Sequence, residues 1–144
     1  MAKRRNDRQD AIRRIVRDKE VRTQRTLVDE LKAYGYECTQ ATVSRDISEM
    51  GLQKLPGGVY VLGEDLRLQR VVSELVSDVL RAGNLIVVKT LPGTASSVAA
   101  IIDAAGLPGV LGVLADNGTV LVVTRDEDEG VRLEGLINKF RSDA

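Results

Sequence analysis

Apolar residues in the first third of the chain recur at the three- and four-residue spacing of amphipathic helices. Three such segments lie at residues 8–18, in the stretch before Gly35, and at residues 39–50. The pattern therefore predicts three short helices that pack on one another. Their apolar positions are Ile12, Ile15 and Val16, then Leu27, Val28 and Leu31, and then Val43, Ile47 and Met50.

The second and third of these helices are joined by a tight turn. Thr23 or Thr26 can cap the start of the second helix, and Gly35 can adopt the left-handed conformation that ends it. Thr39 is an N-cap candidate for the third helix, so only residues 35–38 separate the two. This spacing is typical of a helix-turn-helix.

Two short strand-like runs follow Gly51 in the segment LQKLPGGVYVLG. The turn Pro56-Gly57-Gly58 separates the runs, and its residues are those that hairpin turns favour. We therefore expect a β-hairpin wing after the third helix.

The second half of the chain begins with a helical period at Leu68, Val72, Leu75 and Val79. We expect this helix to end at Gly83-Asn84. The run LIVVKTL that follows is continuously apolar apart from its lysine and threonine, which is typical of a buried strand.

A second helix, a hairpin and a third helix complete this half. Pro92-Gly93 is expected to open the second helix, which buries Val98, Ile101, Ile102 and Ala105, and Gly106 and Pro108 stop it. The runs VLGVLA and TVLVVT flank Asp116-Asn117-Gly118, whose Asn-Gly step is a hairpin signal. Asp126 can cap the last helix. The predicted order is αβαββα.

The fold class expected from these elements is α+β, with two small domains. The wing pattern stops at residues 63–67 and the helical period of the second half begins directly afterwards. We expect a winged helix-turn-helix domain at residues 1–63 and a two-layer α/β domain at residues 66–144. With 144 residues, of which 43% are hydrophobic, the chain can bury a core in each.

A formal net charge of zero conceals an asymmetry between the two halves. Residues 1–70 carry 15 Lys and Arg against 11 Asp and Glu, whereas residues 71–144 carry 6 against 10. The basic excess is concentrated in residues 1–25, which could neutralise phosphates. A solvated basic helix face is the alternative interpretation.

Composition also excludes several classes of chemistry. The chain has no histidine and a single cysteine, Cys38, so the usual zinc sites, histidine-based nucleophilic catalysis and an internal disulfide are excluded. We expect Cys38 to be a small buried apolar residue. No apolar run approaches the roughly 20 residues of a membrane span, and no signal core follows the basic start. We therefore expect a soluble, cytoplasmic protein without metal or cofactor.

The face of residues 39–50 opposite the apolar stripe carries small residues around one arginine. Such a face can approach another surface closely, and a DNA major groove is a surface of that kind. Arg45 can donate two hydrogen bonds to guanine O6 and N7. The neighbouring polar residues can reach other base edges or phosphates; they are Gln40, Thr42, Ser44 and Ser48. The alternative is that these hydroxyls are merely exposed.

Phosphate contacts are expected on either side of that helix. Basic groups of the first helix, among them Arg13, and Lys54 in the wing can hold the DNA backbone. The start of the third helix, with its free N–H groups, also favours a phosphate near Thr39.

Three motifs in order resemble the bacterial arginine repressor family: TQATVSRDI followed by a wing, then KTLPGTASSVAAIID, then GVLADNGTVLVV. The resemblance covers nearly the whole chain. It implies a sequence-specific repressor that binds palindromic operators, and a C-terminal domain that forms trimers which pair into hexamers. It further implies L-arginine as effector between the trimers, and it places Ser44 and Arg45 on the family's DNA-contacting motif.

The effector motif departs from the family pattern. Family members commonly carry Gly-Asp-Asp-Thr in the hairpin, where this chain has Asp116-Asn117-Gly118-Thr119. Asp103 coincides with a family acid near the ligand, and Ser96 falls where relatives often have a longer polar side chain. We expect Ser96, Asp103, Asp116 and Asn117 to form a weakened arginine site. A plain hairpin turn is the alternative for residues 116–118.

Two other functions were weighed against an arginine-responsive repressor. An architectural protein could bind DNA and oligomerise without an effector, as the altered acid motif would permit. An enzyme could use Asp103 and Asp116 as acid and base, but the chain offers no histidine, activated nucleophile or phosphate-binding glycine loop. The sequence therefore favours a regulator that carries out no catalysis.

Overall fold

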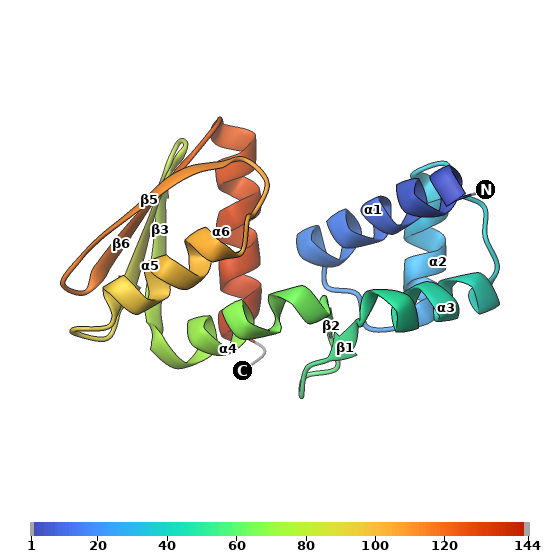
Figure 1. The fold of residues 1–144 in the computed structure, drawn as a ribbon, viewed down its shortest axis with the longest axis horizontal. Helices are drawn as coiled ribbons and strands as arrows, with labels where there is room; N and C mark the ends of the chain where they lie inside the picture. The colour runs from blue at the N-terminus through green and yellow to red at the C-terminus, as the bar shows by residue number, and fades with distance from the viewer. Residues whose placement is uncertain (1, 143–144) are drawn as a thin grey trace. The chain divides into compact units, whose positions relative to one another are not determined.

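The computed structural model describes residues 2–142 and separates into two compact units, Met1–Glu64 and Asp65–Ala144. Figure 1 shows helices and a small hairpin in the first unit, and a sheet with its helices in the second. Each unit has its own hydrophobic interior, so each is described by itself.

The first unit contains the predicted helix-turn-helix. Its helices are α1 (Ala2–Asp18), α2 (Gln24–Ala33) and α3 (Gln40–Met50). Thr23 caps α2 by accepting a hydrogen bond from the backbone N–H of Thr26 at 3.0 Å. Thr39 caps α3 in the same way, accepting from the N–H of Thr42 at 3.2 Å. Each hydroxyl satisfies one of the amide groups that a helix start leaves unpaired.

The apolar faces of the three helices meet in one core. Ile12, Ile15, Leu27, Leu31 and Val43 are completely buried in it. Cys38 is half-buried and packs against this core, and burial raises the pKa of its thiol despite the nearby charge of Arg8. Most of the predicted interior of this unit is confirmed, but four residues predicted to be buried are only partly buried: Val28, Cys38, Ile47 and Met50.

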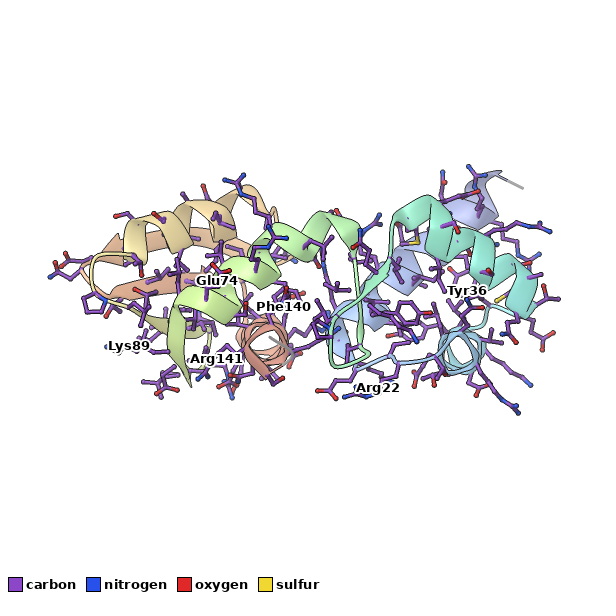
Figure 2. The ribbon with its side chains drawn as sticks, turned by 90° about the horizontal axis from the view of Figure 1, so that it is seen from below. Arg22, Tyr36, Glu74, Lys89, Phe140 and Arg141 are labelled. Carbon is purple, nitrogen blue, oxygen red and sulfur yellow. The ribbon has the colours of Figure 1, made fainter. Side chains whose placement is uncertain are left out.

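The wing is a short antiparallel hairpin of β1 (Gln53–Lys54) and β2 (Tyr60–Val61). It is attached to the chain between α1 and α2, because the N–H of Tyr60 donates to the carbonyl of Val21 at 2.7 Å. Arg22, labelled in Figure 2, donates from Nη1 to the carbonyl of Gly57 at the tip of the wing. The wing is therefore held at both its strand and its tip.

The second unit follows a 3₁₀ turn, η1 (Gly63–Asp65). Its four strands form one antiparallel sheet in the order β3-β4-β6-β5. Its helices all pack on the same side of this sheet, over a core completed by Phe140 (Figures 1 and 2). The elements are α4 (Leu66–Leu75), β3 (Val76–Ala82), β4 (Leu85–Thr90), α5 (Ala95–Ala104), β5 (Val110–Asp116), β6 (Thr119–Thr124) and α6 (Glu127–Ser142).

The predicted helix through Val79 to Gly83 is wrong. α4 ends at Leu75, the chain passes directly into β3, and Gly83-Asn84 is the turn of a hairpin with β4, so the order is αββαββα. A β-bulge between Val76 and Asp78 is the physical reason. It shifts the register so that Val76 and Val79, three residues apart, are both buried, and this spacing imitates a helix.

The hairpin at residues 116–119 and the cap of α6 are as predicted. Asn117 has a φ of 53°, in the left-handed region that an Asn-Gly turn uses. The N–H of Glu129 donates to Asp126 Oδ1 at 2.9 Å, and the acids of the first helical turn lie where the positive end of the helix dipole favours them. A second bulge, between Val110 and Gly112, interrupts β5 on the other edge of the sheet.

Candidate nucleic-acid interface and effector site

One face of α3 is exposed and carries most of the predicted base-reading residues. Ala41, Arg45 and Ser48 are exposed at helical spacing, and Gln40 is exposed at the start of the helix. Val43, on the other side, is completely buried. Gly51 ends the helix in the left-handed conformation, with a φ of 66°. The structure thus brings these polar residues together on a fixed helix.

Arg45 is the most available donor of this face. Its side chain is exposed, and within residues 2–142 no carboxylate forms an ion pair with it. A free guanidinium can present its planar set of N–H groups to a partner from outside the chain. Ser44, next to it, is half-buried and can reach only a surface that comes close to the helix.

Thr42 is already engaged by the helix cap. Its hydroxyl lies 3.1 Å from the Thr39 hydroxyl, and its N–H donates to that same oxygen. The side chain is half-buried at the first turn of α3. We therefore assign Thr42 a capping role first, and its contact with DNA stays a prediction.

Asp46 is a residue whose role the sequence did not predict. It is 1% exposed, yet it is charged, because Arg8 donates from Nε at 2.5 Å and from Nη2 at 2.9 Å to its two carboxylate oxygens. Gln9 donates to the same carboxylate at 3.0 Å and to Glu49 at 2.8 Å. A polar network therefore connects α1 with α3.

The pKa values of this pair follow from the contacts. Burial alone would raise the pKa of Asp46, but the hydrogen bonds from Arg8 and Gln9 and the charge of Arg8 together hold that pKa below its ordinary value. The hydrogen bond to Asp46 raises the pKa of Arg8. Both groups are therefore ionised at neutral pH.

Arg13 is already engaged by two carboxylates of the first unit. Its Nε donates to Glu64 at 2.7 Å and its Nη1 donates to Asp10 at 2.9 Å. A phosphate contact would have to displace one or both carboxylates, so the charge of Arg13 is largely offset within the unit. Its role as a phosphate contact stays a prediction.

Lys54 is open to an outside partner. Its Nζ lies 5.1 Å from the centre of the Tyr60 ring, within the range of a cation–π contact. The ring orients the side chain on the exposed β1 strand of the wing, and no carboxylate of the described residues forms an ion pair with the ammonium group. The geometry is compatible with a phosphate contact beside α3.

The candidate effector residues of the sheet lie at one end of its outer face, which is the face that no helix covers. Asp116 pairs with Thr119, and Thr119 pairs with Lys89, so the three residues follow one row across β5, β6 and β4. Lys89 Nζ donates to the Thr119 hydroxyl at 3.3 Å, and Figure 2 labels Lys89 on the sheet. Asp116 and Asn117 are both exposed.

The other two effector candidates lie on α5. Ser96 and Asp103 are exposed and are separated by two helical turns, so they share one face of the helix. α5 packs on the inner face of the sheet, whereas Asp116 follows the outer face. The structure therefore brings Ser96 and Asp103 together, and Asp116 and Asn117 together, but it does not bring the two pairs to one face.

Gly118 stands in the turn of this hairpin, close to the end of β4. Its carbonyl accepts a hydrogen bond from the N–H of Thr90 at 2.8 Å, so the hairpin lies against the end of β4. A Cβ at this position would lie 3.2 Å from the carbonyl oxygen of Thr90. An aspartate here would push the hairpin away from β4 by a few tenths of an ångström.

The outer sheet face is apolar away from the row that contains Asp78, Lys89, Thr119 and Asp116. One row runs across all four strands as Leu80, Val87, Leu121 and Leu114, and a second contains Leu85 and Val123. Leu80 is 50% exposed and Leu114 is 68% exposed. None of the helices in the described part of the chain is both long and apolar enough to cross a membrane.

Comparison with known proteins assigns both units to one family. Residues 3–68 match the family model "Arginine repressor, DNA binding domain", and residues 72–139 match "Arginine repressor, C-terminal domain". The arginine repressor of Carboxydothermus hydrogenoformans is 39% identical, over 92% of this chain and 96% of that protein. The arginine repressor of Thermus thermophilus is 44% identical, over 89% and 85%. The arginine repressor of Thermotoga petrophila is 37% identical, over 94% of each chain. This chain belongs to the arginine repressor family.

Proposed function

We propose that this chain represses genes of arginine metabolism by placing α3 in the major groove of an operator, with L-arginine as its effector. Membership of the family makes it a DNA-binding transcriptional repressor of arginine metabolism, whereas the groove, the contacts and the effector are our proposal. The observation that carries the proposal is Arg45, which is exposed in the middle of a face of small residues and has no ion-pair partner among residues 2–142. We place this regulator in the cytoplasm and assign it no catalytic step.

Base recognition follows from the geometry of α3. A helix of this kind enters the major groove, where Arg45 can donate two hydrogen bonds to a guanine. Gln40 and Ser48 are both exposed on the same face as Arg45 and can contact the bases next to that guanine. Ser44 is half-buried, so it can contact a base only where the groove lies closest to the helix. Ala41 carries no long side chain and so allows this close approach.

Phosphate contacts then fix the register of the protein on the duplex. The start of α3 supplies backbone N–H groups and the positive end of the helix dipole. Lys54 supplies a charge from the wing, whose position is fixed by Arg22 and by the contact of Tyr60 with Val21. Arg13 can bind a DNA phosphate only if that phosphate displaces Glu64 or Asp10 from the guanidinium.

The outer sheet face supports self-association of the second unit. Monomeric proteins rarely leave a continuous apolar row of this kind in water. The leucines at its two ends, Leu80 and Leu114, are at least half exposed in the single chain. We propose that copies of this chain cover this face in trimers, and that two trimers form a hexamer.

The effector site is proposed to draw on more than one copy. Asp116 and Asn117 lie at the end of the outer face, and Ser96 and Asp103 lie on α5 behind it. A single chain does not present all four residues to one ligand, whereas adjacent copies can. Arginine's guanidinium is best met by an ionised carboxylate, and the two acids of this set supply it.

The proposal is tested by selecting a preferred duplex from a randomised pool with the full-length chain, and then measuring its binding with and without L-arginine. We expect a selected sequence with twofold symmetry, and tighter binding to it with L-arginine than with L-citrulline, which is neutral. If no sequence were enriched, the repressor function would be wrong. Enrichment without any effect of L-arginine would instead support the effector-independent architectural role.

The contribution of Asp116 gives a separate prediction. Replacing Asp116 with alanine is expected to weaken L-arginine binding by about tenfold or more, because a charge-assisted hydrogen bond contributes about 1.5 to 3 kcal/mol. Titration calorimetry on the full-length chain measures this. Asp128→Ala removes the same charge from the start of α6 and should leave the affinity unchanged. An unchanged affinity in Asp116→Ala would remove Asp116 from the site.

A further inference from the structure

A polar network of two residues of α1 and two residues of α3 connects these helices. Arg8 holds both carboxylate oxygens of Asp46, and Gln9 links Asp46 to Glu49 one helical turn further on. The Arg8 side chain is 16% exposed and that of Asp46 is 2% exposed. Two neighbouring residues of α1 therefore hold two residues of α3.

The rest of the contact surface of α3 is apolar. Val43 and the partly buried Ile47 and Met50 contribute to the core. Apolar burial is non-directional, so it determines which side of a helix faces the core but tolerates small rotations about the helix axis. A two-point hydrogen bond between a guanidinium and a carboxylate is geometrically specific. The Arg8–Asp46 contact is therefore the part of the packing that restricts these small rotations.

Rotation of α3 matters because of the residue that precedes Asp46. Arg45 and Asp46 are adjacent and leave the helix about 100° apart, so the direction of one fixes that of the other. With Asp46 held against α1, Arg45 lies on the exposed side. A small rotation of the helix would move the Arg45 guanidinium by several ångströms relative to a base edge.

The same contact also makes one positive charge of α1 unavailable for phosphate binding. Arg8 is one of the basic residues of α1, and its charge is offset by a carboxylate that water barely reaches. Arg8 is then a structural charge, and the phosphate-binding charge of this unit comes from other basic groups such as Lys54. Removing the carboxylate would release Arg8 for phosphate binding.

We propose that Asp46 is a positioning residue for base recognition: held by Arg8 and Gln9, it sets the rotation of α3 and thereby the direction of Arg45. This inference rests on the proposed function of α3 as the recognition helix. It assigns to Arg8 and Asp46 an effect on sequence preference although neither touches a base.

The test compares binding of the full-length variants to the duplex selected by the wild-type chain and to a random-sequence duplex, across a range of salt concentrations. For Asp46→Asn we expect the ratio of the two affinities to fall by about tenfold, while the random duplex binds more tightly. The slope of affinity against salt should become steeper by about one released counterion for each bound chain, because Arg8 gains a phosphate. A merely structural role would not steepen this slope.

A double variant and a matched control separate the positioning role from general damage. Arg8→Gln combined with Asp46→Asn restores a neutral amide pair, so the salt slope should return to the wild-type value and part of the preference should recover. Asp29→Asn removes the same charge from an exposed position on α2 that forms no ion pair among the described residues, and should change neither quantity.

The outcomes are distinguishable from failure of the proposed function. A wild-type chain that prefers no sequence would contradict the proposed function itself. A wild-type preference that Asp46→Asn leaves intact, with an unchanged salt slope, would overturn only the positioning role. Should Asp46→Asn fail to fold by circular dichroism, Arg8→Lys keeps the charge without the two-point contact; it should lower the preference, and an unchanged preference would overturn the proposal.

Discussion

Replacing Arg45 with alanine is expected to abolish most of the preference of this protein for its operator, while much of its salt-dependent binding to any duplex remains. Losing one two-point contact with a base costs about 1 to 3 kcal/mol of discrimination for each recognition helix that makes it. Because an oligomer uses more than one such helix, the losses accumulate. The measurement is the affinity ratio between the selected duplex and a random duplex at fixed salt concentration.

Arg25 provides the matched control for this variant. It is an exposed arginine of α2, and no carboxylate among the described residues forms an ion pair with it. Arg25→Ala therefore removes the same charge from outside the α3 face, and we expect the affinity ratio to be retained. If both variants lowered the affinity ratio equally, loss of a positive charge alone would account for the decrease. The helix α3 would then not be the element that recognises the base sequence.

Replacing Leu121 with lysine is expected to dissociate the assembled protein into single chains at micromolar concentration. Leu121 lies on a central strand, between Val87 and Leu114 in the apolar row of the outer sheet face. A lysine there is tolerated in a single chain, where water reaches this face, but between copies its charge would lose its hydration without a partner. This loss of hydration would cost several kilocalories per mole for each copy in the assembly.

Sedimentation of the full-length protein, with and without L-arginine, measures this effect. Val131→Lys is the control, because Val131 is an apolar residue of α6 that is 48% exposed and does not lie on the sheet. It should assemble like the wild type. Leu121→Lys that sediments as a trimer or hexamer would show that another surface holds the copies together.

Most of the first unit could be predicted from the sequence because its determinants are local. The cap at Thr39 and the turn after α2 involve residues within a few positions of one another. The apolar stripe of α3 and the polar face opposite it also follow from spacing alone. Local rules of capping and periodicity therefore located the polar face that we propose reads DNA, without any knowledge of the fold.

The strand β3 shows where periodicity misleads. Its bulge brings Val76 and Val79 to the same face, and an edge strand with exposed residues between them has no clear alternation. What makes this segment a strand is its pairing with β4 across the Gly83-Asn84 turn. The secondary structure of this segment is therefore determined by its pairing with a neighbouring strand and not by the spacing of its apolar residues, which is also compatible with a helix.

The charged contacts could not be predicted because their partners are far apart in sequence. Arg8 meets Asp46 across 38 positions, and Arg13 meets Glu64 across 51. From the sequence alone, both arginines count as free basic groups of α1. The fold shows that each is offset by a carboxylate, which shifts the expected phosphate contacts toward the wing and the start of α3.

The two bulges have a consequence for how copies of this chain can join. β3 and β5 are the edges of the sheet, and each has a shifted register, between Val76 and Asp78 in one and between Val110 and Gly112 in the other. An edge with an interrupted ladder is a poor template for a strand from another molecule. Growth by edge-to-edge addition, which would lead to open-ended fibres and aggregation, is therefore disfavoured at both edges of the sheet.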